Sequence, residues 1–280
     1  GPELFSRKLT DSFTFVDGAA ETVAATAEHG IPLGFKVDYA QPSGLKVLSG
    51  ARIITAKGDE VIDDGVIVIE GNRIKAIGAR GSVAVPAGAQ VVDMAGKTIM
   101  PGIVDTHWHG SMGSDDIIPQ QSWINYASLA FGVTTVHDPS NSNSEIFAAS
   151  ELAKAGLVTA PRIFSTGRIL YGANTGFTAT VNNLEDAKTA LRRLQAVGAF
   201  SVKSYNQPRR EQRQQIIEAA RELGMMVVPE GGSLYQHNMS MIADGHTTIE
   251  HSIPVAKMYD DVIQFWSQSS TAYNPTLVVA

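Results

Sequence analysis

Two histidines stand one residue apart directly after an apolar run that Pro-Gly interrupts. His107 and His109 belong to the segment IMPGIVDTHWHG, residues 99–110. In a strand, side chains at positions i and i+2 point to the same side, so the two imidazoles are expected to face one way. Imidazoles are good ligands for zinc and similar divalent metals. The pair therefore indicates half of a metal site, although an isolated His-x-His can also be a pair of surface histidines.

The elements that would position these histidines alternate between strand-like and helical runs from residue 100 to the end. LEDAKTALRRLQAVG, for example, places Leu184, Ala187 and Leu191 near helical spacing, and several helical runs end in Gly. Such alternation is typical of parallel strands joined by crossover helices. Seven strand-like runs can be counted, whereas a closed (β/α)8 barrel needs eight strands. The sequence thus predicts an α/β fold with an incomplete TIM-type barrel over residues 100–280.

The residues before this barrel have a different pattern. Residues 45–99 place β-branched runs between Gly-Asp, Asp-Gly and Gly-Asn pairs, which predicts a small β-sandwich segment with a hairpin turn at Gly71-Asn72. Residues 1–44 have weak signals and are expected to be a linker or the tail of an upstream β domain. The opening Gly-Pro, in place of Met, suggests that the native N-terminus lies further upstream.

Composition excludes several classes of function. The chain has 280 residues, of which 44% are hydrophobic and 18% charged, and its net charge of −6 argues against nucleic acid as the main partner. No apolar run approaches the roughly 18 residues that a membrane helix needs. The absence of cysteine removes disulfides, thiolate metal sites and cysteine nucleophiles.

The segment GKTIMPGIVDTHWHG, with ARIITAKGDEVIDDGVIVIEGNRIKAIG before it, resembles the amidohydrolase superfamily of metal-dependent hydrolases. FKVDYAQPSG, GVTTVHDPSN, SVKSYNQPRREQRQ and VVPEGGSLYQHN more closely resemble amidohydrolases that follow a TolB-type β-propeller. This resemblance implies that residues 1–44 are the propeller tail and that the chain is a piece cut at both ends. Because the related propeller-linked proteins hint at export, a periplasmic or exported location is expected over a cytoplasmic one.

The resemblance also assigns metal-binding and catalytic roles to single residues. His107 and His109 would hold one metal, and Lys203, as a carbamate at the end of strand four, would bridge to a second. An unmodified lysine paired with a carboxylate is the plainer interpretation of Lys203. His251 in TTIEHS, at the end of strand six, would ligate the second metal.

Strand five departs from the family pattern, in which a histidine is common. In VVPEGG the strand-end position falls on Glu230, which is the preferred ligand here. His237, seven residues later on a loop or helix start, is the alternative. Zinc is the expected metal, and manganese is a second possibility because a carboxylate favours harder metals.

Three further residues are expected to contact the substrate, namely His137, Tyr171 and Tyr205. The catalytic aspartate that the family places at the end of strand eight has no counterpart before Ala280. An incomplete barrel would expose two strand edges and an apolar lumen, so the chain is expected to form a homo-oligomer.

These features together imply a metal-dependent amidohydrolase that acts on amide or cyclic amide C–N bonds through a metal-activated hydroxide. The expected substrate is a small amide or a peptide-like molecule, as in the imidazolonepropionase-like and prolidase-like branches. Two alternatives remain open: a non-catalytic scaffold or binding module with a degenerate or truncated metal site, and an enzyme with a mononuclear, deaminase-like site that needs no carbamate.

Overall fold

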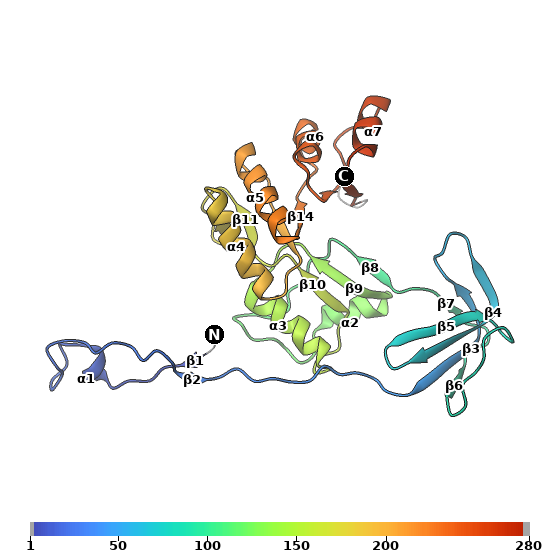
Figure 1. The fold of residues 1–280 in the computed structure, drawn as a ribbon, viewed down its shortest axis with the longest axis horizontal. Coiled ribbons are helices and arrows are strands. Elements are labelled where there is room, and N and C mark those ends of the chain that lie inside the picture. Colours follow the sequence, from blue (N-terminus) through green and yellow to red (C-terminus); the bar gives the residue numbers. More distant parts are fainter. Residues whose placement is uncertain (1–2, 277–280) are drawn as a thin grey trace. The chain divides into compact units, whose positions relative to one another are not determined.

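The computed structural model describes residues 3–276, which divide by their contacts into two units, Gly1–Tyr39 and Ala40–Ala280 (Figure 1). The first unit has little regular structure. Its strand β1 (Glu3–Leu4) pairs antiparallel with β2 (Ile31–Pro32), and a single helical turn, α1 (Leu9–Ser12), lies between them in the sequence.

The second unit begins with a sheet of five strands. The strands are β3 (Leu45–Ile54), β4 (Val61–Glu70), β5 (Arg73–Ala79), β6 (Gln90–Asp93) and β7 (Thr98–Ile99). They lie in the order β5-β4-β3-β6, and β7 also pairs with β3. Pairing of Glu70 with Arg73 confirms the predicted hairpin turn at Gly71-Asn72. Alternate residues of β4 bury Val66 and Val68 in one apolar cluster and Ile67 in another.

The predicted seven barrel strands all form. They are β8 (Ile103–Asp105), β9 (Val133–Asp138), β10 (Arg162–Ser165), β13 (Ser201–Ser204), β14 (Met226–Pro229), β15 (Thr248–Glu250) and β16 (Ala272–Asn274). Each pairs in parallel with a neighbour, as strands joined by crossover helices must. Two short strands were not expected, β11 (Ile169–Tyr171) and β12 (Thr178–Thr180).

Hydrogen bonding divides these strands into three sheets with the orders β10-β9-β8, β12-β11-β13-β14 and β15-β16. Within residues 3–276 the barrel is therefore not closed, as the sequence predicts. The run TIMPGIVDTH differs from the expected single strand. Its first part, β7, joins the five-stranded sheet, and only β8 joins the barrel strands, because Pro101 lacks the N–H that an unbroken ladder would use.

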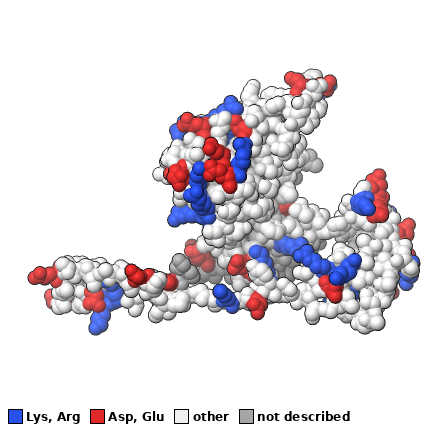
Figure 2. All heavy atoms as spheres, in the orientation of Figure 1, with Lys and Arg blue, Asp and Glu red and all other residues white. Residues whose placement is uncertain are grey.

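Six helices of the second unit follow the predicted runs. They are α2 (Trp123–Ala130), α3 (Asn143–Lys154), α4 (Leu184–Ala196), α5 (Arg210–Leu223), α6 (Tyr235–Asp244) and α7 (Asp260–Ser267). Leu191 of α4 and Ile216 of α5 are fully buried in one core with Leu170 and Val202 of the strands. The outer faces of α4 and α5 have mixed acidic and basic side chains, including the pair Lys188–Glu222 at 2.8 Å (Figure 2). Among the described residues, no helix has the length and apolar character needed to span a membrane.

Candidate metal centre

Four predicted site residues lie at or just beyond the carboxyl ends of barrel strands. Lys203 is in β13, Glu230 follows β14, His251 follows β15 and His107 lies just beyond β8. The carboxyl ends of parallel strands meet at one edge, which is where barrels of this type build their sites. Local backbone geometry brings two of these residues together. Gly231 has a φ of +82°, and a side chain there would collide with the backbone of Glu250, so only glycine lets the two strand ends approach so closely.

His107, Glu230 and His251 form a group that could hold a metal ion. Each offers one ligand atom, and these atoms lie within 4.8 Å of one another. The Oε1 atom of Glu230 is 2.8 Å from Nε2 of His251, and the ring centroids of His107 and His251 are 4.6 Å apart. Two imidazoles and a carboxylate are a common ligand set for zinc and other divalent metals.

Lys203 contacts this group through Glu230. Its Nζ atom lies 2.5 Å from Oε2 of Glu230, and its side chain is only 1% exposed. Burial by itself would raise the pKa of the Glu230 carboxyl, but the charge and hydrogen bond of Lys203 and the hydrogen bond of His251 together lower it. Glu230 is therefore a carboxylate under ordinary conditions and can act as an anionic ligand.

Only one of the two ring nitrogens of His107 has a hydrogen-bonding partner among the described residues. Its Nδ1 lies 2.7 Å from Oε2 of Glu250, whereas its Nε2 is buried and has no hydrogen-bond partner within the described part of the chain. A buried nitrogen without a partner is costly unless a ligand completes it. The free nitrogen thus fits a metal ion bound by this group.

Glu250 itself is ionised. Burial would raise the pKa of its carboxyl, but hydrogen bonds from His107, Thr248 and Asn274 hold that pKa below its usual value. This residue was not predicted from the sequence. The available signal was an acidic residue directly before a proposed ligand, His251, at the end of an otherwise apolar strand.

Besides Lys203, two predicted histidine ligands lie outside the group. His109 is 54% exposed, and its Nδ1 is 3.4 Å from Oδ1 of the buried Asp138. Both histidines follow the end of β8 at Asp105, and their ring centroids lie 5.1 Å apart, so a role of His109 as a ligand stays a prediction. His237 lies in the first turn of α6, where its Nε2 is 2.6 Å from Nη1 of Arg213. Burial and the Arg213 guanidinium lower the pKa of His237.

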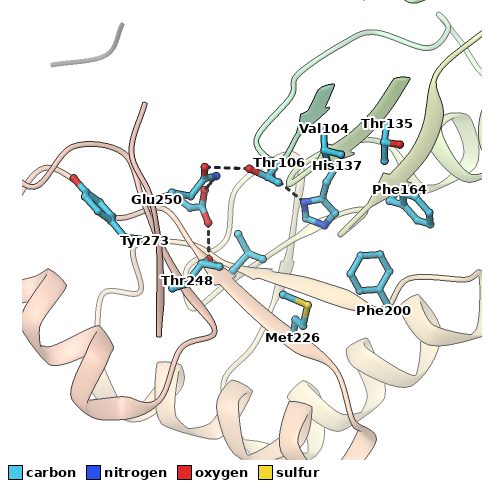
Figure 3. Close-up of a pocket in the computed structure, with 13 residues that line it drawn as sticks. Val104, Thr106, Thr135, His137, Phe164, Phe200, Met226, Thr248, Glu250 and Tyr273 are labelled. Atoms are coloured by element: carbon cyan, nitrogen blue, oxygen red, sulfur yellow. Dashed lines mark hydrogen bonds between the residues drawn. The ribbon is translucent and has the colours of Figure 1, made fainter. Parts of the chain in front are cut away.

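The predicted substrate contacts occupy two different places. His137 lines a cavity of about 430 Å³ in the barrel interior, where its Nε2 is 2.8 Å from Oγ of Ser201 (Figure 3). Burial lowers the pKa of His137 more than its neighbours raise it. Tyr205, by contrast, lines a cavity of about 610 Å³ together with Glu230 and His251. The rings of Tyr171 and Tyr205 meet edge to face, with their centroids 5.7 Å apart.

An open α/β barrel with candidate metal ligands at its strand ends is the class of protein that the fold and the site define. No family model matches the chain. A dihydroorotase from Geobacter sulfurreducens is 28% identical over 214 residues, which cover 71% of this chain and 44% of the relative. A 5-methylthioadenosine/S-adenosylhomocysteine deaminase from Nitratidesulfovibrio vulgaris is 39% identical over 84 residues, which cover 28% of this chain and 19% of the relative. The chain therefore spans less than half the length of these curated relatives.

Solved structures with this fold include an amidohydrolase, with a TM-score of 0.67 and 19% identity over 84% of this chain and 67% of the other. They also include a prolidase complexed with N-methylphosphonate-L-proline, with a TM-score of 0.61 and 22% identity over 74% of this chain and 61% of the other. At 19–22% sequence identity, the similarity to these structures shows only that the fold is shared. Together with the sequence relatives, it supports the resemblance to the amidohydrolase superfamily. The TolB-type propeller upstream and the truncation at both ends stay predictions.

Proposed function

We propose that this chain is part of a metal-dependent hydrolase of carbon–nitrogen bonds, with His107, Glu230 and His251 as ligands of a divalent metal. The observation that carries the proposal is the convergence of their ligand atoms within 4.8 Å, at the carboxyl ends of three barrel strands. The relatives support it, because dihydroorotase, the deaminase and the prolidase are hydrolases acting on C–N bonds. Zinc is the metal we expect.

Lys203 is the residue best placed to extend this site to two metals. Its Nζ is within 2.5 Å of Glu230. An ammonium group cannot ligate a cation, whereas a carbamate formed on Nζ would provide anionic oxygens. His109, whose ring centroid is 5.1 Å from that of His107, is the candidate for a further ligand.

A divalent metal at this site would supply Lewis-acid polarisation of a carbonyl and would lower the pKa of bound water. The chain's own residues provide orientation. Burial and the neighbouring Glu230 raise the pKa of the Tyr205 phenol, so this group stays protonated and can donate a hydrogen bond to a substrate oxygen. The cavity of about 610 Å³ beside Glu230 and His251 has room for a small amide or a dipeptide.

Metal content tests the proposal directly. Protein purified without a histidine tag is assayed by plasma mass spectrometry beside the double variant His107→Ala/His109→Ala. His29→Ala is the control, because the side chain of His29 is 86% exposed and is not among the proposed ligands. Zinc or manganese that is present in the wild type and in the control, but lost from the double variant, is the expected result.

Activity is then measured on the same three proteins with Xaa-Pro dipeptides and small cyclic amides. Hydrolysis that follows the metal content supports the C–N hydrolase. A wild type with no metal above the background of the double variant overturns the proposal and favours the scaffold alternative.

A further inference from the structure

Glu250 is a buried carboxylate with three hydrogen-bonding partners, and no lysine or arginine among residues 3–276 forms an ion pair with it. Its side chain is 2% exposed, and Nδ1 of His107 contacts Oε2 at 2.7 Å. Oγ1 of Thr248 donates to Oε1 at 2.5 Å, and Nδ2 of Asn274 donates to Oε2 at 2.5 Å. Both carboxylate oxygens of Glu250 therefore have hydrogen-bonding partners that hold the side chain in place.

These contacts determine which nitrogen of His107 carries the proton. An ionised carboxylate can only accept hydrogen bonds, so Nδ1 of His107 must be the donor. In the neutral imidazole Nε2 is then the bare nitrogen, and this is the buried atom that has no partner within residues 3–276. Only a bare nitrogen can ligate a metal.

We propose that Glu250 is a positioning residue that fixes the Nδ1–H tautomer and the ring orientation of His107, and so presents Nε2 to the metal. This inference rests on the proposed metal centre and adds to it a residue outside the ligand group. Hydrogen bonds of this kind behind a ligating histidine typically change metal affinity 10–100-fold.

The surroundings of Glu250 give it the rigidity that such a role requires. Thr248 precedes it on the same face of β15, and Asn274 is the last residue of the adjacent β16. The amide oxygen of Asn274 in turn accepts a hydrogen bond from Thr106, at 3.0 Å, one residue before His107. Figure 3 shows Thr106, Thr248 and Glu250 among the residues that line the interior cavity. Thr106, which precedes His107 in the sequence, and Glu250, which contacts its ring, are therefore linked through one hydrogen-bonded network.

Two variants separate positioning from general support of the fold. Glu250→Gln keeps an oxygen that can accept from Nδ1, whereas Glu250→Met has similar volume and no acceptor. Asp244→Asn is the matched control, because Asp244 is also a buried carboxylate, 1% exposed, that is hydrogen-bonded to Arg210 and Arg213 outside the ligand group.

Two measurements are made on each protein. The tautomer of His107 is determined by ¹⁵N NMR on metal-free protein at about pH 8, well above the ordinary imidazole pKa of about 6.5. Zinc affinity is determined by competition with a chromogenic chelator. We expect Nδ1–H in the wild type and in Glu250→Gln, and a mixture of tautomers in Glu250→Met. We also expect zinc affinity to fall about 10-fold in Glu250→Gln and up to about 100-fold in Glu250→Met, with no change in Asp244→Asn.

Results that contradict these expectations distinguish a failure of the Glu250 role from a failure of the proposed metal site. An Nε2–H tautomer in the wild type overturns the role of Glu250 even if Glu250→Met does not fold, and wild-type zinc affinity in a folded Glu250→Met overturns it as well. A wild type that binds no zinc overturns the proposed function, whichever tautomer it shows. Zinc binding that all variants share leaves the proposed function standing and removes only the positioning role.

Discussion

The buried pair of Lys203 and Glu230 makes an asymmetric prediction for metal-free protein. The lysine side chain is 1% exposed, whereas that of Glu230 is 24% exposed and also contacts His251. Glu230→Gln therefore leaves an ammonium group buried without its counter-charge. Lys203→Met leaves a partly exposed carboxylate that still has a hydrogen-bonding partner. We expect the first variant to be much less stable than the second.

The magnitude follows from these exposures. Removing one partner of a buried ion pair and leaving the other buried and charged costs about 3–5 kcal/mol. Replacing the buried charge itself by an apolar side chain of similar volume is often nearly neutral. Glu230→Gln is thus expected to lower the free energy of unfolding by about 3 kcal/mol or more, and Lys203→Met by about 1 kcal/mol or less. The double variant is expected to recover most of the loss caused by Glu230→Gln.

Urea unfolding of the four proteins in a double-mutant cycle, with a chelator present throughout, measures these differences. The chelator matters because a bound metal would change the charge balance at Glu230. Equal losses in the two single variants, or a coupling energy below about 0.5 kcal/mol, would show that the ammonium is not stabilised by Glu230 in the way described.

Three further predictions concern residues outside the ligand group. Burial lowers the pKa of His246 to about 4, so the unfolded chain binds a proton between pH 6.5 and 4 that the folded protein does not bind. The free energy of unfolding should therefore fall by about 3 kcal/mol as pH drops from 6.5 to 4. His246→Gln should remove this pH dependence in urea unfolding. Hydrogen bonds from Arg210, Arg213 and Gln214 hold the pKa of Asp244 low although burial would raise it. Asp244→Asn should therefore be less stable than the wild type at neutral pH, and the difference should shrink as pH falls below about 4. Leu191→Ala, in the fully buried core between α4 and the strands, should cost about 2–5 kcal/mol in the same assay, and a loss below about 1 kcal/mol would contradict that packing.

Much of the fold could be predicted from the sequence because its elements are strongly patterned. The helical run at Leu184–Ala196 combines apolar spacing, an Asn183 cap whose side chain accepts from Asp186, and acidic residues in its first turn. The separation of β7 from β8 was not predictable from hydrophobic pattern, since both halves of TIMPGIVDTH are equally apolar. Pro101 interrupts the ladder locally, but the pairing of β7 with β3 and of β8 with β9 depends on contacts distant in the sequence. Assembly into a homo-oligomer stays a prediction.

The candidate site could be predicted only in part, for a similar reason. Strand-end positions brought His107, Glu230 and His251 together, as expected from parallel strands. The position of His109 could not be derived from the i and i+2 rule, because that rule applies only while a strand continues and β8 ends at Asp105. Glu250 was overlooked because its partner, His107, is 143 residues away in the sequence.

The backbone conformation of His251 has a consequence for attempts to stabilise this chain by mutation. Its φ of +64° lies in the left-handed region, which glycine adopts freely and other residues adopt at a cost of roughly 1 kcal/mol or more. A library at this position that is selected only for thermal stability should therefore enrich glycine over alanine. Selection for metal uptake should instead enrich histidine. The two demands conflict at one residue, so stabilising the protein by consensus or computation should leave position 251 untouched.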